Sequence, residues 1–334
     1  MEKQKLSAEQ VSSILANIHF AANINDLASC NLVIEAIVEN LGVKKVVFSE
    51  IEKIVNADCI LASNTSSLSI TSIASACSKP QNVIGVHFFN PATLMPLVEI
   101  IPGIATDERV TSACKTLIDS WNKTTVIAKD TPGFIVNRVA RPFYSEALRI
   151  YEEGIADMAT IDWAMKEIGG FKMGPFELMD LIGHDVNYVV TETVWTQFYF
   201  DPKFKPALAQ KRLLEAGFLG KKSGRGFYNY TADAKIPEAT KDKDLGKNIV
   251  KRILVMLINE AADTLYFKIA SRDDIDMAMT KGVNYPFGLL KWADEFGIAN
   301  VVKELTSLKD FYEEDRYRIS PMLKQKFIMG KKFY

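Results

Sequence analysis

Apolar segments of strand length alternate with helical segments through the first 128 residues of this 334-residue chain, and this alternation restricts its fold more than any other feature. The segment 32–38 is apolar on both faces, as is typical of strands covered on both sides. Helices are expected at 43–55 and 108–121, with a strand at 83–86 between them. The alternation predicts a parallel sheet between two layers of helices, with ligands bound at the carboxyl ends of the strands.

The first helix expected in this part begins with a capping box, because Ser7 is followed by Gln10. Its apolar positions recur at helical spacing through 11–18. The remaining expected elements are strands at 18–21, 59–62, 97–101 and 125–128 and a short helix at 70–76.

The pattern changes near residue 129, where Thr131-Pro132-Gly133 interrupts the chain and helical segments follow. We therefore expect a sheet domain over 1–128, a first helical unit over 129–230, and a linker with a second helical unit over 231–334. The helices expected in the first unit are 135–153, 160–168, 186–198 and 206–216.

The two helical units are an internal repeat with a constant offset of 114 residues, as between Glu146 and Glu260. The same offset relates Asp162 to Asp276, Gly174 to Gly288 and Gly183 to Gly297. We expect the two copies to pack face to face, burying an apolar surface that one copy alone would expose. The alternative is that the copies have diverged to unrelated positions.

Charge and composition argue against several classes of function. Lysine plus arginine number 40 against 41 acidic residues, which argues against a general nucleic-acid or membrane-surface role. No apolar run approaches the roughly 18 residues of a membrane helix. The start, 1–5, has no signal core or transit face, and the four cysteines lack C-x-x-C spacing. We expect a cytoplasmic protein with buried free thiols and no metal site.

A histidine and a carboxylate stand out among the apolar strands. His87 follows one strand and Glu99 lies within the next, where an unpaired carboxylate would be costly. A glutamate hydrogen-bonded to one imidazole nitrogen leaves the other free to take a proton from a hydroxyl. The alternatives are a structural histidine and a glutamate half-exposed on an edge strand.

Two further polar residues have two interpretations each. Ser66 either holds a reacting oxygen at the carboxyl end of a strand or caps the helix that follows it. Asn137 either reaches across the cleft between domains or is an ordinary polar position on the first long helix.

Five motifs together resemble the 3-hydroxyacyl-CoA dehydrogenase family, including its 3-hydroxybutyryl-CoA members, over about residues 6–229. The second helical repeat resembles the duplicated tail of longer family members. The motifs are Ser63-Asn-Thr-Ser-Ser67, His87-Phe-Phe-Asn-Pro91, Asp130-Thr-Pro-Gly-Phe-Ile-Val-Asn-Arg138, Gly174-Pro-Phe-Glu-Leu178 and Gly220-Lys-Lys-Ser-Gly-Arg-Gly-Phe-Tyr228.

The resemblance implies NAD-dependent oxidation of the 3-hydroxyl of an acyl-CoA, of short chain such as 3-hydroxybutyryl-CoA. His87 would be the base and Glu99 its orienting partner, while Ser66 and Asn137 would hold substrate oxygens. The residues matching family positions that contact NAD are Glu39, Lys44, Ser66, Asn90 and Lys222. For Lys44 and Lys222 the alternative is solvated surface charge.

The chain departs from the family at its start. The family opens with a G-x-G-x-x-G turn for the NAD pyrophosphate, whereas here no glycine precedes Gly42. The expected fold is therefore α/β: a truncated Rossmann-type sheet domain followed by an all-α domain of two repeated units. Three explanations stay open: a start codon assigned too late, one half of a split protein, or a short paralogue.

The function has alternatives as well. A catalytically impaired fragment or a non-catalytic acyl-CoA-binding or structural paralogue is the second hypothesis. A hydroxy-acid dehydrogenase is disfavoured by the segment that begins at His87. The repeat favours a monomer that is its own pseudo-dimer, whereas the resemblance favours a homodimer through the helical region.

Overall fold

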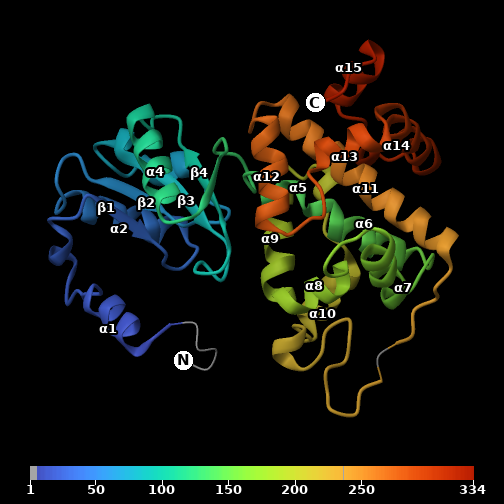
Figure 1. Cartoon of the computed structure of the whole chain (residues 1–334), viewed down its shortest axis with the longest axis horizontal. Helices are drawn as coiled ribbons and strands as arrows, with labels where there is room; N and C mark the ends of the chain where they lie inside the picture. Colours follow the sequence, from blue (N-terminus) through green and yellow to red (C-terminus); the bar gives the residue numbers. More distant parts are fainter. Residues whose placement is uncertain (1–5, 236) are drawn as a thin grey trace.

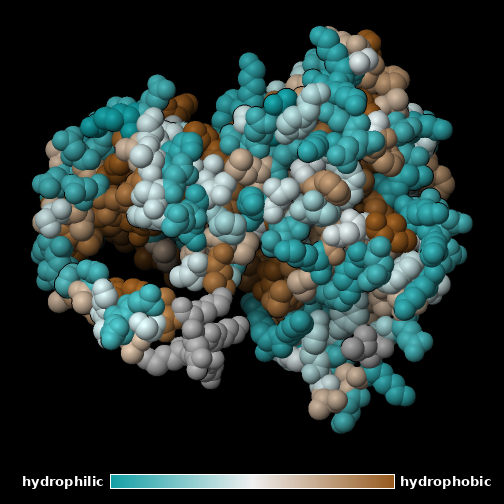
Figure 2. Space-filling view, viewed as in Figure 1, coloured by the Kyte–Doolittle hydropathy of each residue, from teal (hydrophilic) through white to brown (hydrophobic). Residues whose placement is uncertain are grey.

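The computed structural model describes residues 6–235 and 237–334, and it has two parts (Figure 1). The sheet and its helices form the blue-to-teal part, and the rest of the chain forms a larger helical part. Brown, hydrophobic side chains gather on the inner side of the sheet part and where the two parts face each other (Figure 2). The first five residues, where the sequence shows no signal core, lie outside the described residues.

One sheet of five strands forms within the described residues, in the order in which its strands occur in the chain. The prediction of a wholly parallel sheet is wrong at one pair, because β3 and β4 are antiparallel. Only the short segment 89–96 joins them, and a parallel crossover needs about a dozen residues or more. The strands are β1 (Leu32–Glu35), β2 (Ile60–Ser63), β3 (Val83–Phe88), β4 (Leu97–Pro102) and β5 (Thr124–Ile127).

Helices cover both faces of this sheet. Phe48 of α2 and Ile73 of α3 pack on one face, and Val110 and Ile118 of α4 pack on the other. The predicted capping box of α1 is confirmed, since Ser7 and Gln10 exchange hydrogen bonds of 2.8 and 3.2 Å. These helices are α1 (Ala8–Ala16), α2 (Leu41–Glu52), α3 (Ile70–Ala74) and α4 (Glu108–Ser120).

Residues 18–21 are not the strand that the sequence predicts. They form irregular structure after α1, and the side chain of Phe20 is almost fully exposed. An apolar run of four residues becomes a strand only where a neighbouring strand accepts its hydrogen bonds. The segment shows no such pairing among the described residues.

The first helical unit contains the predicted helices with changes in their backbone hydrogen bonding, and it also contains α8, which the sequence analysis did not name. The expected helix 135–153 divides at Ala140, because Pro142 has no N–H to continue the ladder. The expected helix 160–168 changes to a π-helix at Ala164–Ile168. The helices are α5 (Val136–Val139), α6 (Arg141–Glu152), α7 (Met158–Trp163), α8 (Pro175–Ile182), α9 (His184–Gln197) and α10 (Leu208–Glu215).

The second unit repeats the local structure of the first. Asp162 accepts hydrogen bonds from the amides of Phe176 and Glu177, both 2.9 Å, at the start of α8. Asp276 does the same for Leu290 and Lys291 at the start of α13, at 2.8 and 3.0 Å. The helices are α11 (Lys243–Tyr266), α12 (Arg272–Gly282), α13 (Leu289–Phe296), α14 (Ile298–Tyr312) and α15 (Pro321–Met329).

Two glycines are required by these caps. A Cβ atom on Gly174 would lie 2.3 Å from the Asp162 carboxyl group, and one on Gly288 would lie 2.4 Å from that of Asp276. Real Cβ atoms do not approach that closely, so the glycines preserved between the copies have the same steric role.

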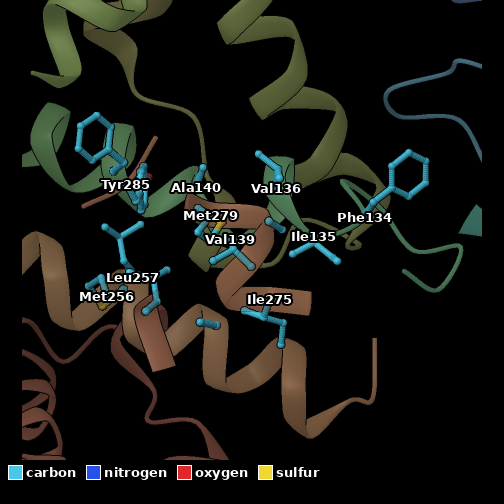
Figure 3. Close-up of a cluster of buried hydrophobic side chains, with 14 of the residues drawn as sticks. Phe134, Ile135, Val136, Val139, Ala140, Met256, Leu257, Ile275, Met279 and Tyr285 are labelled. Carbon is cyan, nitrogen blue, oxygen red and sulfur yellow. The ribbon is translucent and has the colours of Figure 1, made fainter. Parts of the chain in front are cut away.

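The two copies pack face to face through α5, α6 and α11, as the repeat predicts. Two ion pairs cross this contact in a reciprocal way: Arg138 to Glu260 at 2.6 Å, and Arg252 to Glu146 at 3.1 Å. Residues of both copies, among them Val139, Met256 and Ile275, share one buried apolar cluster (Figure 3).

The cysteine side chains are thiols, and the helices in the described ranges include none that could span a membrane. All four cysteines are free, with Cys59 and Cys114 buried and Cys30 and Cys77 half-buried. Burial raises the pKa of the Cys77 and Cys114 thiols to about 11, which makes them poor nucleophiles. Along the described ranges, no helix is both long and apolar enough to cross a bilayer.

Candidate active site

The antiparallel pairing of β3 with β4 places His87 directly opposite Glu99. The imidazole Nδ1 lies 2.7 Å from Glu99 Oε2, and both side chains are buried. The rings of Phe89 and Phe134 pack against the imidazole at 4.6 and 5.9 Å. The carboxylate thus fixes Nδ1 and leaves Nε2 as the nitrogen that can exchange a proton.

Glu99 also contacts the helical part. Its Oε1 accepts hydrogen bonds from the amides of Ile135 and Val136, both 3.0 Å, at the start of α5. The two amides are free backbone donors at the helix start, so the Glu99 carboxylate satisfies them. Asn137 is the next residue on α5 and is half-buried.

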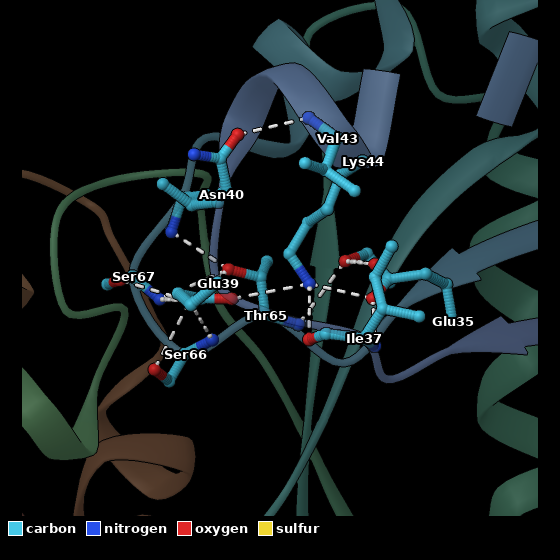
Figure 4. A network of polar contacts seen from close by, with 11 residues as sticks. Glu35, Ile37, Glu39, Asn40, Val43, Lys44, Thr65, Ser66 and Ser67 are labelled. Carbon is cyan, nitrogen blue, oxygen red and sulfur yellow. Dashed lines mark hydrogen bonds and ion pairs between the residues drawn. The ribbon is translucent and has the colours of Figure 1, made fainter. Parts of the chain in front are cut away.

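The loop after β2 holds the carboxylate of Glu39 (Figure 4). Glu39 Oε1 accepts hydrogen bonds from the amides of Ser66 and Ser67 at 3.0 and 3.2 Å, from the Ser66 hydroxyl at 3.3 Å and from the Thr65 hydroxyl at 2.6 Å. Burial by itself raises the pKa of Glu39, but the hydrogen bond from Thr65 and the charge of Lys44 outweigh it, so the pKa is lowered.

Lys44 is buried beneath this loop. Its ammonium group lies 2.7 Å from Glu35 Oε1 and 3.3 Å from Glu39 Oε2. The Ser63 hydroxyl donates to the second Glu35 oxygen at 2.7 Å. Lys44 is therefore the centre of a buried charge network and not a solvated surface lysine.

Two contacts bring the neighbouring elements to the same edge of the sheet. Asn64 accepts a hydrogen bond from the Phe88 amide at 2.8 Å, which joins the loop after β2 to the end of β3. Asn90, which is exposed, lies two residues after Phe88. From the helical part, the side-chain amide of Gln197 donates to the Ser67 carbonyl at 3.1 Å. The loop after β2, the end of β3, the start of α5 and the end of α9 thus lie where the sheet part meets the helical part.

Both the sheet part and the helical part match known protein families. Residues 1–131 match the model of the 3-hydroxyacyl-CoA dehydrogenase NAD binding domain, and residues 133–230 and 248–332 match that of its C-terminal domain. The chain belongs to the 3-hydroxyacyl-CoA dehydrogenase family. These dehydrogenases are NAD-dependent oxidoreductases, in agreement with the resemblance and the fold class inferred from the sequence.

Several relatives are similar over most of the chain. The 3-hydroxyadipyl-CoA dehydrogenase of Escherichia coli is 35% identical over 97% of this chain and 86% of its own length. A probable 3-hydroxybutyryl-CoA dehydrogenase of Deinococcus radiodurans is 41% identical over 69% of this chain and 82% of its own. The crystal structure of 3-hydroxybutyryl-CoA dehydrogenase from Escherichia coli matches with a TM-score of 0.91 and 35% identity over 98% of this chain and 88% of that one.

The chain also matches part of a larger protein. It is 34% identical over its whole length to the fatty acid oxidation complex subunit alpha of Acinetobacter baumannii, of which it spans 49%.

Lys222 lies apart from the other predicted residues of this dehydrogenase family member. Its ammonium group pairs with Asp185 at 2.5 Å, at the start of α9, whereas Gln197 at the other end of α9 touches Ser67. Twelve residues of helix separate Asp185 from Gln197, or about 18 Å at 1.5 Å per residue. The structure therefore pairs His87 with Glu99 and gathers Ser66 and Lys44 around Glu39. Asn90 and Asn137 follow residues of these contacts in the chain, and Lys222 lies apart.

Sequence reasoning gave no role to two residues that border the site. Asp130 accepts hydrogen bonds from the Ser69 hydroxyl and from the amides of Ile70 and Thr71, at 2.7 to 3.0 Å, and so ties the first helical residues to α3. The position of Asp130 at the predicted domain boundary is the sequence feature that could have indicated this role. Gln197 lies in an ordinary helical pattern and has no such feature. Within the described part of the chain, no group of three acidic, histidine or cysteine side chains is arranged to hold a metal ion.

Proposed function

We propose that the protein oxidises the 3-hydroxyl of a short-chain (3S)-3-hydroxyacyl-CoA to a ketone, with NAD as the oxidant. The observation that carries this proposal is the buried pair of His87 on β3 and Glu99 on β4. Similarity to dehydrogenases of 3-hydroxyadipyl-CoA and 3-hydroxybutyryl-CoA supports the substrate class and the short chain.

In this proposal His87 is the general base. Its Nε2 takes the proton of the 3-hydroxyl, while Glu99 holds the Nδ1 proton and balances the positive charge that forms on the ring. Bound NAD supplies the acceptor for the hydride that leaves C3. Ser66, on the loop after β2, and Asn137, on α5, hold the substrate oxygens.

The residues around Glu39 fit the polar half of the cofactor next to its reactive ring. Hydroxyls, a carboxylate and an ammonium group suit the hydroxyls of a ribose, and we assign Glu39, Lys44, Ser66 and Asn90 to this contact. Lys222 is kept as a family-based assignment that requires movement of the helical part toward the sheet. The printed sequence has no G-x-G-x-x-G segment for the pyrophosphate.

We further propose a cytoplasmic monomer. Four free cysteines suit a reducing compartment. The second helical copy covers the face that a single copy would expose, so a partner chain is not needed to bury it.

The test is replacement of His87 by alanine. Turnover of 3-hydroxybutyryl-CoA should fall by roughly 10² to 10⁴-fold, while NADH binding measured by calorimetry stays as in the wild type. The matched control is His184→Asn, because His184 is also buried against a carboxylate, Asp180 at 2.8 Å, but within the helical part. Equal turnover in His87→Ala and wild type would contradict the proposal.

A further inference from the structure

Arg141 is a buried cation without an acidic partner. Six lysines and arginines are classed as buried among the described residues. Five of them form ion pairs with carboxylates: Lys44, Arg138, Lys203, Arg252 and Arg316. Arg141 forms none within the described chain, although burying an unpaired charge costs several kcal/mol.

The surroundings of Arg141 are polar but incomplete. One terminal nitrogen donates to the Thr191 hydroxyl at 3.0 Å, and the guanidinium lies over the Tyr144 ring at 4.9 Å. Its Nε atom is buried without a partner, as is the hydroxyl of Tyr285 close by. A guanidinium edge and a hydroxyl, both buried and without a partner, are donors that a carboxylate can accept from.

The duplicated copy shows that the fold does not require these polar groups. At the offset of 114 residues, Arg141, Tyr144 and Thr191 correspond to Val255, Ile258 and Leu305. Phe171 corresponds in the same way to Tyr285. All four counterparts are buried and apolar. The position in the second copy is therefore an ordinary apolar core position, whereas the equivalent position in the first copy holds the charged Arg141.

Arg141 lies next to the candidate active site. It is four residues after Asn137 in the chain, directly beyond the break between α5 and α6 at Ala140. On the opposite side, α9 carries Thr191 toward Arg141 and Gln197 toward Ser67. Tyr285 comes from the second copy and enters the buried cluster that contains Ala140 (Figure 3).

We propose that Arg141, with the hydroxyls of Tyr285 and Thr191, binds a terminal carboxylate of the acyl chain, so that the substrates are 3-hydroxyacyl-CoA esters with an acidic end. This inference rests on the proposed function, since it places C3 beside Asn137. In a six-carbon chain, three carbon–carbon bonds of about 1.5 Å separate C3 from the terminal carboxyl carbon, a short reach that suits two residues four apart in the chain.

The test compares the binding of adipyl-CoA and hexanoyl-CoA by calorimetry. The two esters have the same chain length and differ in the terminal carboxylate, and neither has a 3-hydroxyl to oxidise. The wild type should bind adipyl-CoA roughly 10²-fold more tightly or better. In Arg141→Val, which has the residue of the duplicated position, the two affinities should become nearly equal, with hexanoyl-CoA bound as well as before.

Two variants serve as controls. Tyr285→Phe, which also copies the duplicated position, should lose part of the preference and keeps the test valid if Arg141→Val does not fold. Arg252→Gln removes a buried arginine elsewhere and should keep the full preference. Equal affinities in the wild type, or an unchanged preference in both Arg141→Val and Tyr285→Phe, would overturn the inference.

Two further measurements are needed. The first distinguishes a carboxylate of the substrate from a free carboxylate, and the second distinguishes the carboxylate site from the proposed oxidation. Free adipate that binds through Arg141, while adipyl-CoA shows no preference over hexanoyl-CoA, would overturn the assignment to the substrate. Turnover of 3-hydroxyadipyl-CoA by the wild type tests the proposed function alone. Its absence beside an intact adipyl-CoA preference would contradict the oxidation and support the carboxylate site.

Discussion

At the scale of single residues, Glu99 serves both parts of the molecule. One oxygen binds His87 in the sheet and the other caps α5 in the helical part. The orientation of the proposed base therefore depends on the contact between the two parts.

This dependence predicts the effect of Glu99→Gln. Glutamine can still accept from the α5 amides, but its NH₂ group would face Nδ1 and place the ring proton on Nε2, where the base must be free. We expect kcat/KM to fall by roughly 10² to 10⁴-fold and the acidic limb of the pH–rate profile to change. A profile that coincides with the wild type would rule out the orienting role.

Lys44 gives a prediction on stability. Lys44→Met would leave Glu35 buried without its ion-pair partner, which should lower the free energy of unfolding by about 3–5 kcal/mol. Adding Glu35→Gln should restore part of this loss. Urea unfolding of both single variants and the double variant measures the coupling, and strictly additive losses would show that the pair is not coupled.

The sequence predicted the His87–Glu99 pair because a carboxylate inside an apolar strand needs a partner. The register of β3 and β4 makes them partners, because it sets these two residues opposite each other. Arg141 gave no such signal. An arginine before a proline at a helix start is ordinary, and the lack of an acidic partner depends on α9 and on a loop 144 residues later in the chain.

At the scale of elements, Asp162 caps α8 with a carboxyl group that is almost fully buried. Burial raises the pKa of Asp162 to about 7, against the opposing hydrogen bonds from Phe176, Tyr228 and Glu177. Burial also raises the pKa of Asp276 at the matching cap.

These shifts predict how stability depends on pH. A carboxyl group whose pKa is raised on folding binds its proton more tightly in the folded state. Its stabilising contribution is complete below the ordinary carboxyl range near pH 4 and is lost as the pH rises through about 7. The melting temperature should therefore contain a component that falls from pH 5 to pH 8. Asp162→Asn should flatten this component in calorimetric scans, and an unchanged slope would contradict the assignment.

Elements also show where sequence patterns stop being informative. The apolar pattern located β3 and β4 but not their relative direction, which the short loop between them decides. Helical periodicity likewise continued through Ala140 and Ala164, although Pro142 divides one helix and the other widens to a π-helix. Backbone hydrogen bonding, which periodicity does not report, makes the difference.

At the scale of the whole molecule, two helical copies bury a common apolar surface within one chain. Because this surface is already covered, we expect the mass of a single chain in light scattering across a wide range of protein concentration. A mass of two chains that persists on dilution would contradict the monomer.

The crossed ion pairs between Arg138 and Glu260 and between Arg252 and Glu146 show how closely the two copies mirror each other. In a dimer of identical chains, any substitution at such a contact occurs twice, so a change useful on one side must also be tolerated on the other. Fusion of the copies removes that constraint. Each half accumulates its own mutations, and one half can specialise in chemistry while the other is selected only as its scaffold.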